Sequence, residues 1–235
     1  MNCGSRISDC GSEERERIAD CRLRITDLKN LFFNSQFAIR DSRFFIAGVD
    51  EAGRGPLAGP VVAAACILEK DIAGVADSKS LSAKKREALF SVITKEAISW
   101  KISAIDHTII DEINILQATF RAMAEAVSGL AIKPELVLVD GPYKIPHLEI
   151  EQQALIKGDK TTYIISAASI IAKVSRDRIM EEYDQIFPLY GFAKHKGYPT
   201  KAHIEAIRMY GPSPIHRRSF LRNLTLLRQM KVPIL

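Results

Sequence analysis

Residues 44–60 read FFIAGVDEAGRGPLAGP, and this stretch decides how the rest of the chain is interpreted. A strand-like apolar run ends in two adjacent carboxylates, Asp50 and Glu51, and a turn rich in glycine and proline follows at once. Carboxylates bind hard divalent cations, and glycine lets backbone N–H groups approach a ligand closely. The two features together point to metal-assisted chemistry on a phosphodiester.

Two other interpretations of this stretch compete with a metal site. An Asp-Glu pair followed by glycine and proline is often only a solvated loop that reverses the chain. Gly53-x-Gly55 after a strand also suggests a dinucleotide-binding fingerprint, which must open a helix. Here Pro60 leads instead into VVAAACIL, residues 61–68, and this β-branched apolar run predicts a second strand. The dinucleotide interpretation is therefore rejected.

A third carboxylate follows another predicted strand. Residues 107–130 have helical periodicity, and ELVLVD at 135–140 is a short apolar run that ends on Asp140. A strand, a helix and a strand in succession favour a right-handed crossover and parallel pairing. Because the carboxyl ends of parallel strands meet at one edge of a sheet, we expect Asp140 to converge there with Asp50 and Glu51. Ligands of open α/β sheets bind at this edge.

The rest of the chain alternates between predicted strands and helices. We expect strands at 98–105 and 153–159 and helices at 80–97, 161–187, 200–210 and 218–230. The strand at 153–159 would end on a further acid, Asp159. Either Ser80 or Ser82 can cap the first of these helices.

The chain resembles the ribonuclease HII family in a series of ordered sequence blocks. They are DEAGRGPLAGP (50–60), DSKSLS (77–82), LVDGP (138–142), IKGD (156–159), SAASIIAKVSRDR (166–178) and FAKHKGYPT (192–200). The resemblance covers residues 44–222. It implies an α/β fold of the ribonuclease H-like kind, with a mixed five-stranded sheet flanked by helices and a C-terminal helical extension.

We expect three regions along the chain. Residues 1–40 match nothing in the family and form an N-terminal arm of unknown role, and residues 41–188 form the catalytic domain. Residues 189–235 form a basic helical extension that binds substrate. From Ile186 to Leu235 there are nine Lys or Arg and one acid, within a chain of net charge +5. Such a surface suits a polyanion, although a solvated basic face is an equal alternative on charge alone.

The resemblance implies a two-metal site for Mn²⁺ or Mg²⁺. Its catalytic and metal-binding acids would be Asp50, Glu51, Asp140 and Asp159. The position of Asp159 before a predicted helix also suits an N-cap. Asp177 is the rival fourth acid, but it lies inside a helix between two arginines, where a paired surface residue is expected.

The resemblance also implies a set of substrate-binding residues. Gly53, Arg54 and Gly55 resemble the turn that recognises the ribose 2′-OH through its backbone, and that hydroxyl distinguishes RNA from DNA. Tyr198 resembles the tyrosine that packs on the sugar beside the cut. Basic side chains that suit phosphate contacts are Lys79, Lys173, Lys194, His195 and Lys196.

The implied activity is metal-dependent endonucleolytic hydrolysis of the RNA strand of RNA–DNA hybrids, with 5′-phosphate products. It extends to cuts 5′ to ribonucleotides embedded in duplex DNA. Two alternatives remain open: another nuclease of the same fold, such as a junction resolvase, or a non-catalytic hybrid-binding protein. The first should lack the Gly-Arg-Gly turn and Tyr198, and the second should lack the four acids.

Composition narrows the class of protein further. The sequence is 47% hydrophobic, which supports a folded core, and no apolar run is long enough to span a membrane. The four cysteines have no C-x-x-C spacing, so neither a disulfide framework nor a zinc site is expected. We expect Cys66 to be a small buried hydrophobic residue. A cytoplasmic monomer without a targeting segment is the expectation.

Overall fold

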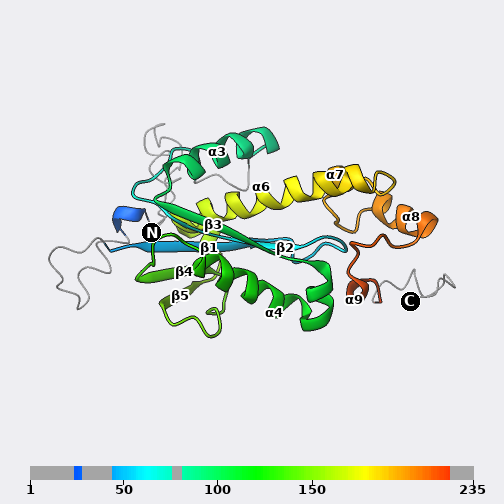
Figure 1. Cartoon of the computed structure of the whole chain (residues 1–235). Helices are drawn as coiled ribbons and strands as arrows, with labels where there is room; N and C mark the ends of the chain where they lie inside the picture. The colour runs from blue at the N-terminus through cyan, green and yellow to red at the C-terminus, as the bar shows by residue number, and fades with distance from the viewer. Residues whose placement is uncertain (1–23, 28–43, 76–80, 223–235) are drawn as a thin grey trace, which may run out of the picture.

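A computed structural model describes residues 24–27, 44–75 and 81–222 of the chain. Its centre is a five-stranded sheet with the strand order β3-β2-β1-β4-β5 (Figure 1). Strand β2 runs antiparallel to both of its neighbours, β1 and β3, whereas β4 is parallel to both β1 and β5. The strands are β1 (Ile46–Ala52), β2 (Val61–Ile67), β3 (Ser99–Ile105), β4 (Leu136–Asp140) and β5 (Glu151–Leu155).

Helices cover both faces of the sheet (Figure 1). The helices α3 (Ala83–Glu96) and α6 (Tyr163–Ile186) pack on one face, and α4 (His107–Ser128) packs on the other. Ser82 caps α3 by accepting a hydrogen bond from the Lys85 N–H. Because helices cover both faces of the sheet, alternate residues of β1 enter two different cores, as expected for a strand that is buried on both sides.

The contact between α6 and β1 is unusually close. A Cβ atom on Gly48 would lie 2.5 Å from the carbonyl carbon and oxygen of Ile164, so only glycine allows the two backbones to approach. The helix contributes small buried residues along the same contact, namely Ser166, Ala167, Ala168 and Ala172. This packing fixes the distance between α6 and the strand that carries Asp50.

The C-terminal region wraps around the turn that follows β1. Its helices are α7 (Phe192–His195), α8 (Lys201–Tyr210) and α9 (Arg218–Leu221). An isolated bridge joins Ala58 to His216, and Asp111 of α4 accepts hydrogen bonds from the N–H groups of Arg218 and Ser219. The C-terminal region is therefore attached both to the turn that follows β1 and to helix α4.

The structure corrects several expected elements. The strand expected at 153–159 is β5 and ends at Leu155, and a short helix, α5 (Gly158–Thr161), follows it. The helix expected at 107–130 ends at Ser128 and is interrupted at Asn114, whose φ is 69°. Of the helix expected at 218–230, only Arg218–Leu221 is helical within the described residues, and 223–235 lie outside them.

Three further observations concern composition. Cys66 is buried in β2 as expected, and burial raises the pKa of its thiol to about 12. Ile25, from the N-terminal arm, is buried in the core on the sheet face that α3 and α6 cover, and most of the arm lies outside the described residues. Within the parts of the chain that the structure describes, no helix is both long and apolar enough to cross a membrane.

Substitution of Gly48 tests the contact between α6 and β1. Gly48→Ala should lower the free energy of unfolding by about 1–3 kcal/mol, because the backbones of a strand and a helix cannot move apart without disturbing both cores. The matched control is Gly55→Ala, since a Cβ atom there would lie 3.6 Å from Tyr198 Cε1, an ordinary contact. Equal urea-unfolding midpoints for the two variants would contradict this account.

Candidate active site

The acids near the carboxyl ends of β1 and β4 come together at one edge of the sheet. The two strands pair in parallel with Val49 opposite Val139, so Asp50 and Asp140 occupy the next pair of positions. Both side chains lie on the α6 face, because Gly48 and Leu138, two residues earlier in each strand, face that helix. The convergence expected from the order of strand, helix and strand is therefore confirmed.

Asp50 has the strongest electrostatic perturbation in this cluster. It is 5% exposed, and burial raises the pKa of its carboxyl well above the usual range. The negative charges of Glu51 and Asp140 raise that pKa further. Hydrogen bonds from the Ser169 side chain and the Glu51 N–H act in the opposite direction, the second at 2.7 Å. Carboxylates held together in this way repel one another, and a bound cation would relieve the repulsion.

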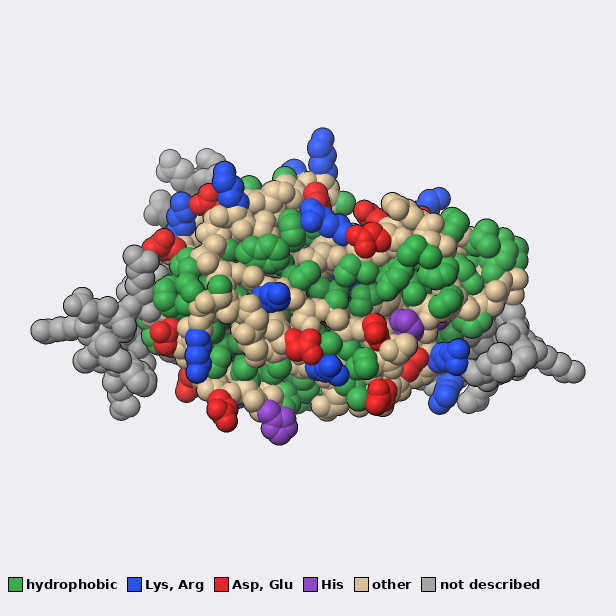
Figure 2. Space-filling view, viewed as in Figure 1, with side chains coloured by type: hydrophobic (Ala, Val, Ile, Leu, Met, Phe, Trp, Pro, Cys, Tyr) green, Lys and Arg blue, Asp and Glu red, His purple; other side chains and the backbone are tan. Residues whose placement is uncertain are grey.

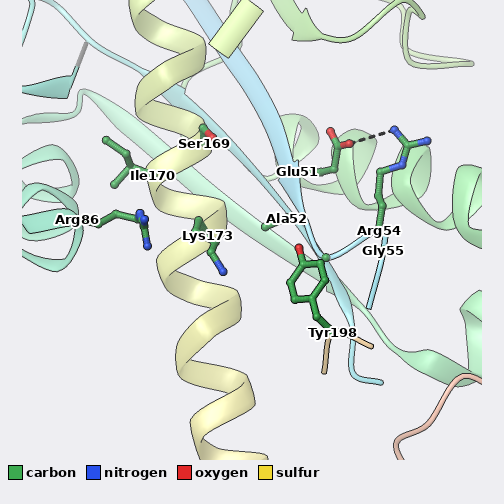
Figure 3. A pocket seen from close by; sticks show the side chains of 10 residues that line it. Glu51, Ala52, Arg54, Gly55, Arg86, Ser169, Ile170, Lys173 and Tyr198 are labelled. Atoms are coloured by element: carbon green, nitrogen blue, oxygen red, sulfur yellow. Dashed lines mark hydrogen bonds and ion pairs between the residues drawn. The ribbon is translucent and has the colours of Figure 1, made fainter. Parts of the chain in front are cut away.

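Glu51 lies at the entrance to the site. Burial raises the pKa of its carboxyl, whereas Arg54 lowers it through an ion pair with 3.2 Å between Nη1 and Oε1 (Figure 3). The pair spans three residues of the turn, so it also holds the Arg54 side chain beside the acids. Arg54 is therefore placed at the cluster, although the expected role of this turn concerned its backbone.

The backbone of Asp159, in α5, contacts one acid of the cluster. It is 3% exposed, and its N–H donates to Asp140 Oδ1 at 3.2 Å. The N-cap position of α5 belongs to Lys157 and that of α6 to Thr162, so Asp159 caps neither helix. The alternative of an N-cap is wrong, because Asp159 lies inside the short helix α5, one residue after its start.

Asp177 lies farther along α6 in an ion pair. Its Oδ1 is 2.5 Å from Lys173 Nζ, and it does not line the cavity beside the acids. The expected pairing is present, with Lys173 as the partner. Of the arginines that flank Asp177, Arg178 pairs with Glu87 at the surface, whereas Arg176 is buried.

A cavity of about 390 Å³ opens next to Glu51 (Figure 3). The Gly53–Gly55 turn and Tyr198 form one side, and α6 forms the other with Ser169, Ile170 and Lys173. Arg86 of α3 also lines it. The structure therefore brings together three expected substrate-binding features, the turn, Tyr198 and Lys173.

Tyr198 is held by its backbone, with its ring 42% exposed beside the turn. Its carbonyl accepts from Thr200 N at 2.8 Å and from His203 Nδ1 at 2.9 Å. The Nε2 atoms of His203 and His216 are 3.0 Å apart, and the Nδ1 of His216 accepts from the Ser213 N–H. Burial lowers the pKa of His203 to about 4 and that of His216 to about 3, so both imidazoles are neutral near pH 7.

The remaining expected contacts lie elsewhere. Lys196 forms an ion pair with Glu181 at 2.6 Å, and Lys194 is exposed. The ring of His195 stacks on that of His203, with 4.3 Å between the ring centroids. Lys79 lies outside the described residues. None of the first three lines the cavity.

Sequence reasoning missed Arg86 and Ser169. Ser169 precedes Lys173 by one helical turn, so a shared face of α6 was the available signal. No sequence signal pointed to Arg86, because its helix is distant in sequence from the acids. In the structure, its Nη2 also donates to the Leu81 carbonyl. Within the described residues, no three acidic, histidine or cysteine side chains already stand close enough together to enclose an ion.

Comparison with known proteins identifies the family. The model of the ribonuclease HII family matches residues 47–223. The ribonuclease HII of Caldicellulosiruptor bescii is 53% identical over 204 residues, which cover 86% of this chain and 98% of that protein. The crystal structure of the ribonuclease H2 from Pyrococcus horikoshii OT3 has a TM-score of 0.63 and 34% identity, and it covers 75% of this chain and 93% of that one.

A more distant structure shares the fold. Bst-RNase HIII, solved in complex with Mn²⁺, has a TM-score of 0.55 at 19% identity, over 79% of this chain and 73% of that one. The family match sets aside both the junction resolvase and the non-catalytic hybrid-binding protein. The chain belongs to the ribonuclease HII family, the endoribonucleases that cleave the RNA of RNA–DNA hybrids and cut at ribonucleotides embedded in DNA.

Proposed function

We propose that the converging acids form the catalytic centre and cut the phosphodiester on the 5′ side of a ribonucleotide. The observation that carries this proposal is the position of Asp50, whose buried carboxyl lies beside the charges of Glu51 and Asp140. Asp159 joins them through its contact with Asp140. Buried carboxyls with raised pKa values, such as those of Asp50 and Glu51, are costly to fold, and they cluster at functional sites.

The donor set fits Mg²⁺ or Mn²⁺. Both ions prefer carboxylate oxygen and water, and the residues that would hold them are Asp50, Glu51, Asp140 and Asp159. When bound, a pair of such ions supplies an activated water and stabilises the leaving 3′ oxygen. The Ser169 hydroxyl keeps Asp50 oriented, and Arg54 keeps Glu51 at the cavity.

The cavity suits one nucleotide of a duplex whose backbone lies along the turn. Gly53 has a φ of 101°, and a Cβ atom there would overlap Arg176, so the turn keeps its shape only with glycine. Tyr198 is adjacent to Gly55 and offers a flat face to a sugar. Lys173 and Arg86 line the cavity from α6 and α3 (Figure 3), and their positive charge suits phosphate oxygens.

One face of the molecule carries charged side chains of both signs (Figure 2). Figure 2 shows basic and acidic side chains interspersed on one face, without a single basic field. We infer that the duplex is held by the C-terminal region, residues 189–235, where exposed Lys194, Lys201 and Arg208 are found. The enzyme acts as a monomer in the cytoplasm, where its nucleic acid substrates are made.

Removal of one central acid should separate binding from chemistry. Asp50→Asn should lower the cleavage rate by on the order of 10²-fold or more, because the metal-holding carboxylate is lost. Its affinity for a ribonucleotide-containing duplex in EDTA should equal or exceed that of the wild type, since a negative charge near phosphate is removed. Single-turnover cleavage and fluorescence anisotropy measure the two quantities. Retained cleavage at saturating Mn²⁺ would remove Asp50 from the site.

A pair of Asp→Asn variants tests the choice of the fourth acid. Asp159→Asn should lose most activity and need more Mn²⁺ for half-maximal rate. Asp177→Asn should retain most activity, because its partly exposed pair with Lys173 is worth only about 0–1 kcal/mol. Metal titrations of the cleavage rate compare the two. If Asp177→Asn is the inactive one, the assignment of Asp159 is wrong.

The role of Tyr198 predicts a difference between substrates. Tyr198→Ala should impair cleavage at a single embedded ribonucleotide more than cleavage of a long hybrid, because the isolated ribonucleotide offers only one register. Tyr198→Phe separates the ring from the hydroxyl, and Tyr143→Ala, at another exposed tyrosine, is the control. The measurement is kcat/KM on both duplexes. Equal losses on both would assign Tyr198 to general binding or folding.

A further inference from the structure

Two arginine side chains are buried beside the turn that follows β1. Arg176 of α6 is 1% exposed, and Arg217, just before α9, is 0% exposed. Neither forms an ion pair with a carboxylate of the described residues. A buried guanidinium is costly unless its donors are satisfied. These two cations must therefore be stabilised in another way.

Backbone carbonyl groups satisfy both guanidinium groups. Arg217 donates to the carbonyls of Gly53 at 2.7 Å, Arg54 at 3.1 Å and Gly59 at 2.9 Å. Arg176 donates to those of Pro60 at 3.0 Å, Ala58 at 3.2 Å and Lys196 at 3.0 Å. Five of these six acceptors lie within residues 53–60. The two arginines thus hold most of the turn by its carbonyl oxygens.

The bonds from Arg217 determine where two N–H groups point. In a trans peptide the C=O and the N–H point in opposite directions, and no described peptide bond is cis. Since the carbonyls of Gly53 and Arg54 face Arg217, the N–H groups of Arg54 and Gly55 face away from it. No described residue accepts a hydrogen bond from either N–H. Both belong to the cavity wall.

We propose that Arg217 is a positioning residue for ribose recognition: it turns the N–H groups of Arg54 and Gly55 toward the cavity as donors for a ribose hydroxyl. This inference rests on the proposed role of the Gly53–Gly55 turn. The cation also polarises the two peptides whose oxygens it binds, which strengthens their N–H groups as donors. If Arg217 were paired with a carboxylate instead, it would neither orient these two peptides nor polarise their N–H groups.

Arg176 makes a matched comparison. It is buried to the same degree and also holds three carbonyls, but none of them belongs to Gly53 or Arg54. Burial lowers the pKa of Arg176 to about 10 and that of Arg217 to about 9, so both remain cations near pH 7. The two residues differ in which peptides they orient, and this difference allows a general loss of stability to be separated from a loss of ribose recognition.

The test compares binding of two duplexes that differ by one 2′-OH. One is all DNA and the other carries a single ribonucleotide, and affinities are measured in EDTA for the wild type and for Arg217→Lys. Lysine keeps the charge but cannot span three carbonyls. We expect the preference for the ribonucleotide to fall about tenfold or to unity, the value of one or two hydrogen bonds. Affinity for the all-DNA duplex should not change.

Controls distinguish this role from folding. Arg176→Lys should also lower stability but should reduce the preference for the ribonucleotide less than Arg217→Lys, because Arg176 packs against Gly53 without binding the carbonyl of Gly53 or Arg54. Arg121→Lys, at an exposed site on α4, should change neither property. An unchanged preference in Arg217→Lys, or equal losses of affinity for both duplexes, overturns the inference.

Gly55→Ala separates failure of the inference from failure of the proposed turn. Its methyl group fits beside Tyr198 but occupies the cavity side of the turn. If Gly55→Ala loses the preference and Arg217→Lys does not, the turn reads ribose and Arg217 is not needed. If neither variant loses it, or the wild type has none, both proposals fall.

A measurement on the wild type covers the case in which Arg217→Lys does not fold. The same two duplexes are titrated into ¹⁵N-labelled protein. The amide signals of Arg54 and Gly55 should shift further with the ribonucleotide duplex than with all-DNA duplex. Equal shifts with the two duplexes overturn the inference.

Discussion

The approach of α6 to β1 at Gly48 is the constraint on which the active site depends. The helix lies so close to the strand that a single methyl group would overlap the Ile164 backbone. This closeness places Ser169 within hydrogen-bonding reach of Asp50 and directs Lys173 into the cavity. A helix seated farther from the sheet would leave Asp50 exposed to water and would remove the burial that contributes most to its raised pKa.

Charge is arranged on two sides of one turn. The acids lie at the ends of β1 and β4, where Glu51 and Asp140 raise the pKa of Asp50, while two buried arginines hold the turn from behind. Between them stand Gly53, Arg54 and Gly55. Arg217 orients the peptides of this turn, and the Arg54 side chain pairs with Glu51. Both clusters are costly to bury. Their position on either side of the reactive turn is consistent with a functional reason for that cost.

Much of this arrangement could be predicted from local sequence, and particular residues show where the prediction ended. Strands that end in Asp50 and Asp140 and are separated by a helix implied convergence, and β1 and β4 confirm it. Asp159 was expected at the end of a strand, yet α5 carries it, because a helix of four residues is too short for periodicity to show. Nothing in the sequence indicated that Arg176 and Arg217 are buried, since carbonyl acceptors have no signature in the sequence.

The amino-acid sequence by itself determined the order of strands and helices, the acids that end β1 and β4, and the family to which the chain belongs. These properties depend on side-chain periodicity and on short blocks of neighbouring residues. Only the tertiary structure decided which side chains bury their charge and what they hold. Arg217 binds the Gly53 carbonyl from 164 residues away, and a backbone oxygen becomes its partner only when folding brings the two together.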